Sequence, residues 1–540
     1  MCLSEKKEES KSTEAEPKVN ASELRERIVE VEKGLQKWLL ENSQGPKTAA
    51  PVGRASIDFI LRGHGLQTSN AEVQGKLQPS PPSPQSKRTT NIEDLGSIAG
   101  SKRPIQYCDP QKHLQDAMDQ VFKRKRRSLE GASLDGTLSP ELAREFLDNF
   151  CKHYQPDLFD NFINIKLMYL IPDLIGTLEV RIDPSTMMLY YVMLYHGALN
   201  HRAENKSQTG DFMRRFYVQC LRFIPNWEKH AAGSKADLIT AILLARADSH
   251  QCDLDFSWNM HKLVCLCAVR QNMHVLDKDH LNTLISAKPL TEGADQYRMG
   301  LWGLVHTDLV FRLLHDKPAM LTADVANWHV NLPAVEIDPE LPAFAIPDLA
   351  FLVRFRLVFH LLRFYEVTGH CLGDEEYRAR CIEKLCEEIQ DSMKEWPVAD
   401  LMTENENART LWWVLYEVTL AACCSVMIII QELTDIRARL PGHTSREGIV
   451  SPHPLSVKIA RQILHLANEG MNKIPITPTA SIIWGLNRCY MAYGCLRTRM
   501  PDLDLLKDVT QGLANVAETD SDLMPLLTAL VVLNETIHAR

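Results

Sequence analysis

The sequence predicts an all-α protein. Apolar residues recur at helical spacing from Ser139 to residue 540, and the alternating pattern of a half-buried strand is nearly absent. Ser139 and Pro140 have the residue types that favour a helix start, namely a capping serine and a proline in the first turn. We find no fixed-period repeat, which disfavours a regular solenoid. The periodic segments are 212–223, 237–246, 257–269, 297–314, 348–367, 377–393, 408–433, 454–468, 479–496 and 523–537. We therefore expect a large multi-helical domain over residues 139–540.

Composition places the chain among globular proteins of ordinary polarity. Its 540 residues exceed the size of one compact core, and 45% are hydrophobic, which is enough to bury a large interior. The net charge of −9 gives no general attraction to nucleic acid, so contact with DNA would need a local basic patch. No secretory signal is visible in residues 1–20, so we expect the 14 cysteines to be reduced thiols.

One segment, 411–430, has the length of a membrane span. It carries a single charged residue, Glu417, and no basic residues follow it directly. Because many amphipathic segments surround it, we expect a buried core helix and no membrane partner.

Residues 1–21 are polar and charged, and we expect them to be disordered. Residues 22–41 predict a short coiled coil whose apolar positions follow a 4-3-4-3 spacing. The seam consists of Leu24, Ile28, Val31, Leu35 and Trp38. With fewer than three heptads, it would support a weak homodimer at most. The alternative is a lone amphipathic helix that packs on the main body.

Residues 42–138 read as a linker that contains a basic run. The stretch Pro79–Pro84 is proline-rich, and a helical stretch at 113–127 ends in five consecutive cations. These are Lys123, Arg124, Lys125, Arg126 and Arg127. Such a run in an acidic protein predicts nuclear import and a nuclear location. The alternative is a solvated helix end favoured by the helix dipole.

Signatures of catalysis and of metal binding are absent from the sequence. There is no phosphate-binding loop, no nucleophile elbow and no aspartate-rich helix. Cys265 and Cys267 are too close in sequence for a paired zinc motif. The histidines at 274, 306 and 360 have no second ligand four residues further on. We expect no enzyme activity, no metal and no cofactor.

Residues 297–333 carry an ordered set of residue types. An arginine precedes a helix with a tryptophan and an aspartate, followed by a Lys-Pro turn and a closing Leu-Pro. The set is Arg298, Trp302, Asp308, Lys317-Pro318 and Leu332-Pro333. This block resembles the middle homology region of the fungal-specific transcription factor domain, found in binuclear-zinc-cluster proteins. The family's glycine and arginine before the proline are Asp316 and Lys317 here. The resemblance covers residues 140–335 well and the carboxyl half loosely.

The resemblance implies a nuclear transcription regulator whose helical region controls activity, through other transcription factors, a homodimer or a small-molecule effector. The family's amino-terminal zinc cluster cannot form from this sequence, because Cys2 is the sole cysteine before Cys108. Direct DNA binding is therefore doubtful. Either the cluster lies upstream of Met1 or a partner binds the DNA. The alternative function is a helical interaction protein of the cytosol. We expect Trp302 in the core and Arg298 or Asp308 holding neighbouring helices or the turn at Pro318.

Overall fold

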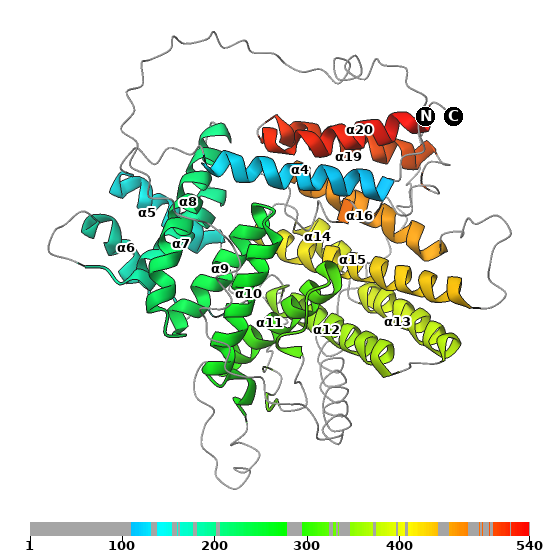
Figure 1. Cartoon of the computed structure of the whole chain (residues 1–540), viewed down its shortest axis with the longest axis horizontal. Helices are drawn as coiled ribbons and strands as arrows, with labels where there is room; N and C mark the ends of the chain where they lie inside the picture. Colours follow the sequence, from blue (N-terminus) through cyan, green and yellow to red (C-terminus); the bar gives the residue numbers. More distant parts are fainter. Residues whose placement is uncertain are drawn as a thin grey trace, which may run out of the picture.

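The part of the chain described by the computed structural model is helical throughout, without a strand (Figure 1). It comprises residues 110–130, 138–153, 159, 162–175, 181–200, 206–277, 294–322, 328–330, 333, 346–370, 374–395, 398–405, 409–440, 453–473, 485–486, 489, 496, 500–518 and 520–538. The expected coiled coil at 22–41 and the expected disorder at 1–21 lie outside these residues. For the residues described, the all-α prediction is confirmed.

The described helices are named here in the order in which they occur along the chain. In chain order they are α4 (Pro110–Glu130), α5 (Pro140–His153), α6 (Ile165–Leu174), α7 (Pro184–Asn200), α8 (Lys206–His230), α9 (Lys235–His250), α10 (Leu254–Arg270), η3 (Met273–Val275), α11 (Ala294–His315), α12 (Ile346–His370), α13 (Glu375–Glu395), α14 (Val398–Glu404), α15 (Arg409–Arg439), α16 (Pro454–Lys473), α19 (Met500–Ala517), η7 (Ser521–Leu523) and α20 (Met524–His538).

Helix α7 is the core of the amino-terminal group, where it packs against α5, α8 and α9. It is apolar around its whole circumference, as expected for a helix enclosed on all sides. Gly197 permits the close approach of α5, because a Cβ at that position would lie 1.9 Å from the carbonyl oxygen of Phe146. Helix α5 starts as predicted, with the Ser139 hydroxyl accepting from the Leu142 N–H at 3.2 Å.

Helix α15 occupies the middle of the carboxyl half, in contact with α11, α12, α13, α14 and α16 (Figure 1). Its stretch Trp412–Arg439 is long and apolar enough to cross a membrane, by length and composition alone. However, 72% of its most apolar window is buried against the rest of the protein. Burial by neighbouring helices is what we expect of a core helix.

Helix α4 lies beside α20, so that segments nearly 400 residues apart in sequence are in contact (Figure 1). Leu114, Ala117 and Val121 form its buried face, at the spacing of one side of a helix. This helix falls inside the range 42–138 that we predicted to be a linker. Residues 110–130 are therefore part of the folded body, because their apolar face is covered by the last helix.

Candidate functional site

Asp308 is the centre of the most densely hydrogen-bonded cluster around α11. Its side chain is fully buried and accepts the backbone N–H groups of Met320, Leu321 and Thr322 at 3.0–3.2 Å. The Thr322 hydroxyl donates a further bond at 2.9 Å. Burial alone would raise the pKa of Asp308, but the hydrogen bonds from His261 and from Thr322 outweigh it and leave the pKa below its ordinary value. Asp308 is therefore an anion that holds the turn after Pro318.

His261 and Cys265 face this carboxylate from the neighbouring helix α10. They are four residues apart and so share one side of the helix. The His261 Nε2 lies 3.5 Å from the Asp308 Oδ1 and 3.4 Å from the Cys265 Sγ. The imidazole stacks on Phe311, with ring centroids 5.2 Å apart. Burial, followed by the charge of Asp308, raises the pKa of Cys265 well above its ordinary value, so the thiol keeps its proton.

These three side chains are the combination of donors that zinc accepts, with nitrogen, sulfur and oxygen atoms all within 4.8 Å of one another. Among the described residues, no fourth His, Cys, Asp or Glu atom joins the group. A structural zinc site takes four protein ligands, and a catalytic one keeps a position open to substrate. A sealed set of three fits neither arrangement. The sequence reasoning missed the group because it considered pairs of cysteines and three other histidines.

We expect the purified chain to contain no stoichiometric zinc, because the cluster is complete as a hydrogen-bonded unit. Elemental analysis of protein prepared with added zinc measures this directly. The variant Cys265→Ser, with Cys267→Ser as the matched control in the same helix, should give the same zinc content as the wild type. One zinc per chain that is lost in Cys265→Ser and kept in the control would overturn this expectation.

The remaining residues of the resemblance are structural as well. Arg298 forms a two-pronged ion pair with Asp277 at 2.5 and 3.1 Å and a second pair with Asp295 at 2.6 Å. It thus ties α11 to the segment after η3. Trp302 is 3% exposed and packs edge-on against Phe355, with centroids 5.0 Å apart. Trp302 lies in the core, as predicted.

The turn that follows α11 contains the residues in which the chain departs from the family pattern. Asp316 has a φ of 50°, in the left-handed region. Glycine adopts this conformation without strain, and aspartate tolerates it better than most residues. Lys317 pairs with Asp255 on α10 at 2.7 Å. Pro318 is exposed, while Pro333 is buried. The turn is therefore held from two sides, by Asp308 and by Asp255.

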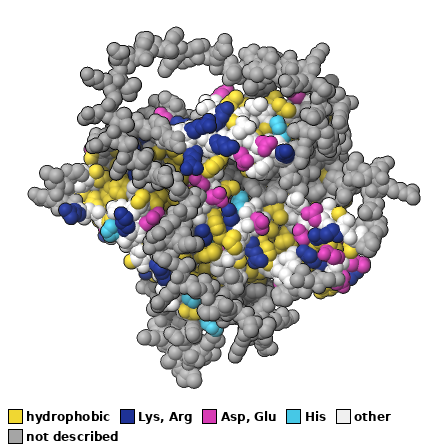
Figure 2. All heavy atoms as spheres, in the orientation of Figure 1, with side chains coloured by type: hydrophobic (Ala, Val, Ile, Leu, Met, Phe, Trp, Pro, Cys, Tyr) yellow, Lys and Arg dark blue, Asp and Glu magenta, His cyan; other side chains and the backbone are white. Residues whose placement is uncertain are grey.

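The fold buries one cation of the basic run on α4 and leaves the other four exposed. Lys125 is buried, and its ammonium group lies 2.8 Å from the Asp520 carboxylate. The four other cations, Lys123, Arg124, Arg126 and Arg127, are exposed. Figure 2 shows Lys and Arg side chains gathered on the part of the surface where α4 lies in Figure 1. Four of the five cations of the run are therefore accessible to solvent in the docked helix.

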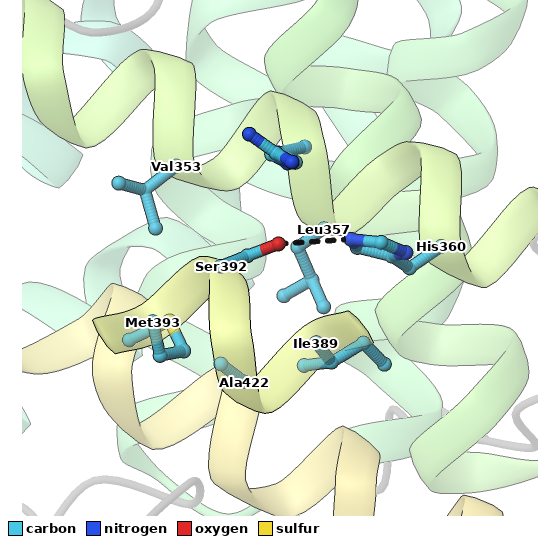
Figure 3. Close-up of a pocket in the computed structure, with 8 residues that line it drawn as sticks. Val353, Leu357, His360, Ile389, Ser392, Met393 and Ala422 are labelled. Atoms are coloured by element: carbon cyan, nitrogen blue, oxygen red, sulfur yellow. Dashed lines mark hydrogen bonds between the residues drawn. The ribbon is translucent and has the colours of Figure 1, made fainter. Parts of the chain in front are cut away.

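A small hollow lies between α12, α13 and α15 (Figure 3). It encloses about 250 Å³ including open solvent, which is below the usual range of ligand pockets. The Ser392 hydroxyl donates to the Glu388 carbonyl at 2.8 Å, and its oxygen lies 3.2 Å from the His360 Nε2. Burial and the charges of Arg356 and Arg363 lower the pKa of His360 to about 4, so the imidazole is neutral at pH 7. The lining residues are Val353, Arg356, Leu357, His360, Ile389, Ser392, Met393 and Ala422.

In the part of the chain that the structure describes, buried polar groups thus hold helices and turns together. Comparison with protein-family models found no matching family, and comparisons with curated proteins and with solved structures found no match either.

Proposed function

We propose that the chain is a nuclear transcription regulator of the fungal zinc-cluster type, whose helical region regulates activity. The observation that carries the proposal is the turn at residues 316–318. Where the resembling family has a glycine, Asp316 adopts the left-handed conformation that makes glycine favourable. The left-handed backbone at position 316 therefore explains why the resembling family has a glycine there.

The other residues of the block support the same proposal. Arg298, Trp302 and Asp308 lie on one helix but point to three different parts of the structure. Arg298 anchors the segment after η3, Trp302 fills the core and Asp308 holds the turn. Structural contacts account for all three residues, so the block needs no catalytic role to explain it, which is compatible with a regulatory domain.

The buried thiols and the buried carboxylate of Asp308 give little support to a catalytic role. The thiols of Cys220, Cys265 and Cys489 are buried, and burial raises the pKa of each well above its ordinary value. Asp308 is saturated by donors. Groups so fixed in one protonation state are poor general acids, bases and nucleophiles. We therefore propose that the chain is not an enzyme and that it acts through protein partners, including a weak homodimer through residues 22–41.

The proposal predicts that the exposed cations of α4 direct nuclear import. Changing Lys123, Arg124, Arg126 and Arg127 to alanine should abolish nuclear accumulation of the tagged chain, because an import receptor needs accessible positive charge. Lys125 is left unchanged, so its ion pair with Asp520 keeps α4 docked. Fluorescence microscopy of the tagged chain gives the ratio of nuclear to cytoplasmic signal.

A matched control removes four exposed cations elsewhere, with the same change in net charge. Arg380, Lys384, Lys394 and Lys507 suit this purpose, since all four are exposed and lie on helices other than α4. The control should stay nuclear. A wild-type chain that stays in the cytoplasm would instead support a helical interaction protein of the cytosol. Equal nuclear signal in both quadruple variants would show that the basic run does not direct import and is only a solvated helix end.

A further inference from the structure

The last turn of α4 carries a serine that bonds to an acidic residue near the other end of the described chain. The Ser128 hydroxyl lies within hydrogen-bond distance of both oxygens of Asp522, at 3.0 and 2.9 Å. Asp522 belongs to η7, which leads directly into α20, and is 8% exposed. Ser128 itself is half-buried. The serine therefore contributes to the contact that holds α4 on the body.

A second polar contact lies one helical turn away. Lys125 is three residues before Ser128, so both side chains are on the same face of α4. Its ion pair with Asp520 is 2.8 Å long and almost fully enclosed, with the two side chains 6% and 11% exposed. The carboxyl-terminal half of α4 is thus held by one ammonium group and one hydroxyl group. Both face the acidic segment 520–522, which comes directly before α20.

The five residues immediately before Ser128 are all cations, Lys123 to Arg127. Protein kinases with acidic substrate grooves select serines that follow such runs, because the positive charges complement the groove. We propose that Ser128 is a phosphorylation site for a kinase of this class, and that its phosphate releases α4 from α20. The proposal deepens the proposed function and rests on it for one consequence: the released helix presents all five cations, Lys125 included, to an import receptor.

The reaction is an ordinary phosphoryl transfer from ATP. The Ser128 Oγ bonds to the γ-phosphorus, the bond from that phosphorus to the β–γ bridging oxygen breaks, and ADP leaves. The hydroxyl proton passes to the catalytic carboxylate of the kinase. The product has lost the hydrogen that Ser128 gives to Asp522.

Three physical effects of the phosphate act in the same direction. A phosphoserine carries about −1.5 to −2 charges and would lie against the carboxylates of Asp522 and Asp520, which repel it. It also sits in the last turn of α4, where the helix dipole disfavours negative charge. Finally, it competes with Asp520 for the Lys125 ammonium group. The docked state therefore loses a hydrogen bond and gains a like-charge contact.

Docking and phosphorylation should exclude each other. A kinase binds its substrate serine in an accessible segment, whereas Ser128 in the docked helix is half-buried and bonded to Asp522. The variant Asp520→Asn weakens docking without touching the basic run that the kinase reads. We expect it to be phosphorylated at Ser128 at least 10-fold faster than the wild type.

The experiment treats the full chain with ATP and the catalytic subunit of a cyclic-AMP-dependent protein kinase, with mass spectrometry to locate the phosphate. Hydrogen exchange of the α4 amides then reports docking, and the α11 amides serve as the internal reference for the folded body. Phosphorylated wild type should exchange at least 10-fold faster in α4 and unchanged in α11. Ser128→Ala should carry no phosphate at this position and keep α4 protected. In Asp522→Asn, which lacks the repelling carboxylate, the phosphate should accelerate exchange less.

Unchanged α4 exchange in a chain fully phosphorylated at Ser128 would overturn the inference. So would failure of the kinase to modify Ser128 in Asp520→Asn once its α4 amides exchange rapidly. Nuclear localisation is scored separately, in cells, with Ser128→Asp. If exchange responds to phosphate while the tagged chain never enters the nucleus, the switch stands and the proposed nuclear function fails.

Discussion

Replacing Asp308 with alanine is expected to lower the free energy of unfolding by about 3–5 kcal/mol. The change leaves the N–H groups of Met320, Leu321 and Thr322 without their acceptor in a partly buried turn. It also leaves the Thr322 hydroxyl and the His261 imidazole facing a cavity. Each buried donor without a partner costs about 1–3 kcal/mol, and relaxation of the turn offsets part of the sum. Urea unfolding followed by far-ultraviolet circular dichroism measures the effect.

The matched control for Asp308 is Asp316, eight residues further on. Its side chain is exposed and its backbone is left-handed, a conformation that asparagine also tolerates. The variant Asp316→Asn should therefore stay within about 0.5 kcal/mol of the wild type. If Asp308→Ala costs less than 1 kcal/mol, the turn after Pro318 is held mainly by other contacts and its assigned role is wrong.

Lowering the pH from 7 to 5 is expected to destabilise the chain by about 2 kcal/mol for each of three histidines, one buried and two half-buried. Burial lowers the pKa of His196 to about 4, of His250 to about 3 and of His360 to about 4. For His250 the neighbouring His196, Arg246 and Lys125 act in the same direction.

The sign follows from where protons bind. Between the ordinary histidine pKa of about 6.5 and the lowered folded values, the unfolded chain takes up protons that the folded chain refuses. The stability from these neutral imidazoles is complete above the unfolded pKa and is lost as the pH falls toward the folded pKa. Acid therefore favours the unfolded state in this window.

The variant His360→Gln tests the contribution of His360 to this loss of stability, because glutamine has no charged form. Its loss of stability between pH 7 and pH 5 should be smaller than that of the wild type by about 2 kcal/mol. His230→Gln, at an exposed position on α8, is the control for removing a histidine and should show the wild-type loss. Equal losses in His360→Gln and wild type would show that His360 is protonated in the folded chain.

Helical periodicity located most of the described helices, including α9, most of which is buried, but it missed α6, α7 and α19. Helix α7 was absent from the predicted segments because apolar residues surround its axis and leave no periodic contrast. By contrast, the start of α5 at Pro140 followed from local chemistry, a capping serine before a proline, and was found.

The candidate site was less accessible to sequence reasoning. His261 and Cys265 carry a local signal, since four residues on a helix place two side chains on one face. Their contact with Asp308, however, depends on how α10 lies against α11, which no local pattern encodes. The same holds for Lys125. The sequence identified it as one cation of a run, but its burial depends on Asp520, 395 residues further along the chain.

The separation of 395 residues between Lys125 and Asp520 determines when α4 can dock during synthesis of the chain. The pairs of α4 with Asp520 and Asp522 cannot form until a ribosome has made the last helices of the body. At typical rates of about 5–20 residues per second, some 395 residues take about 20–80 s to synthesise. During that interval the apolar face of α4 and the ammonium group of Lys125 lack the partners that the last helices supply in the finished protein. Docking of α4 is consequently a late step in folding, and it reports that the body has been completed.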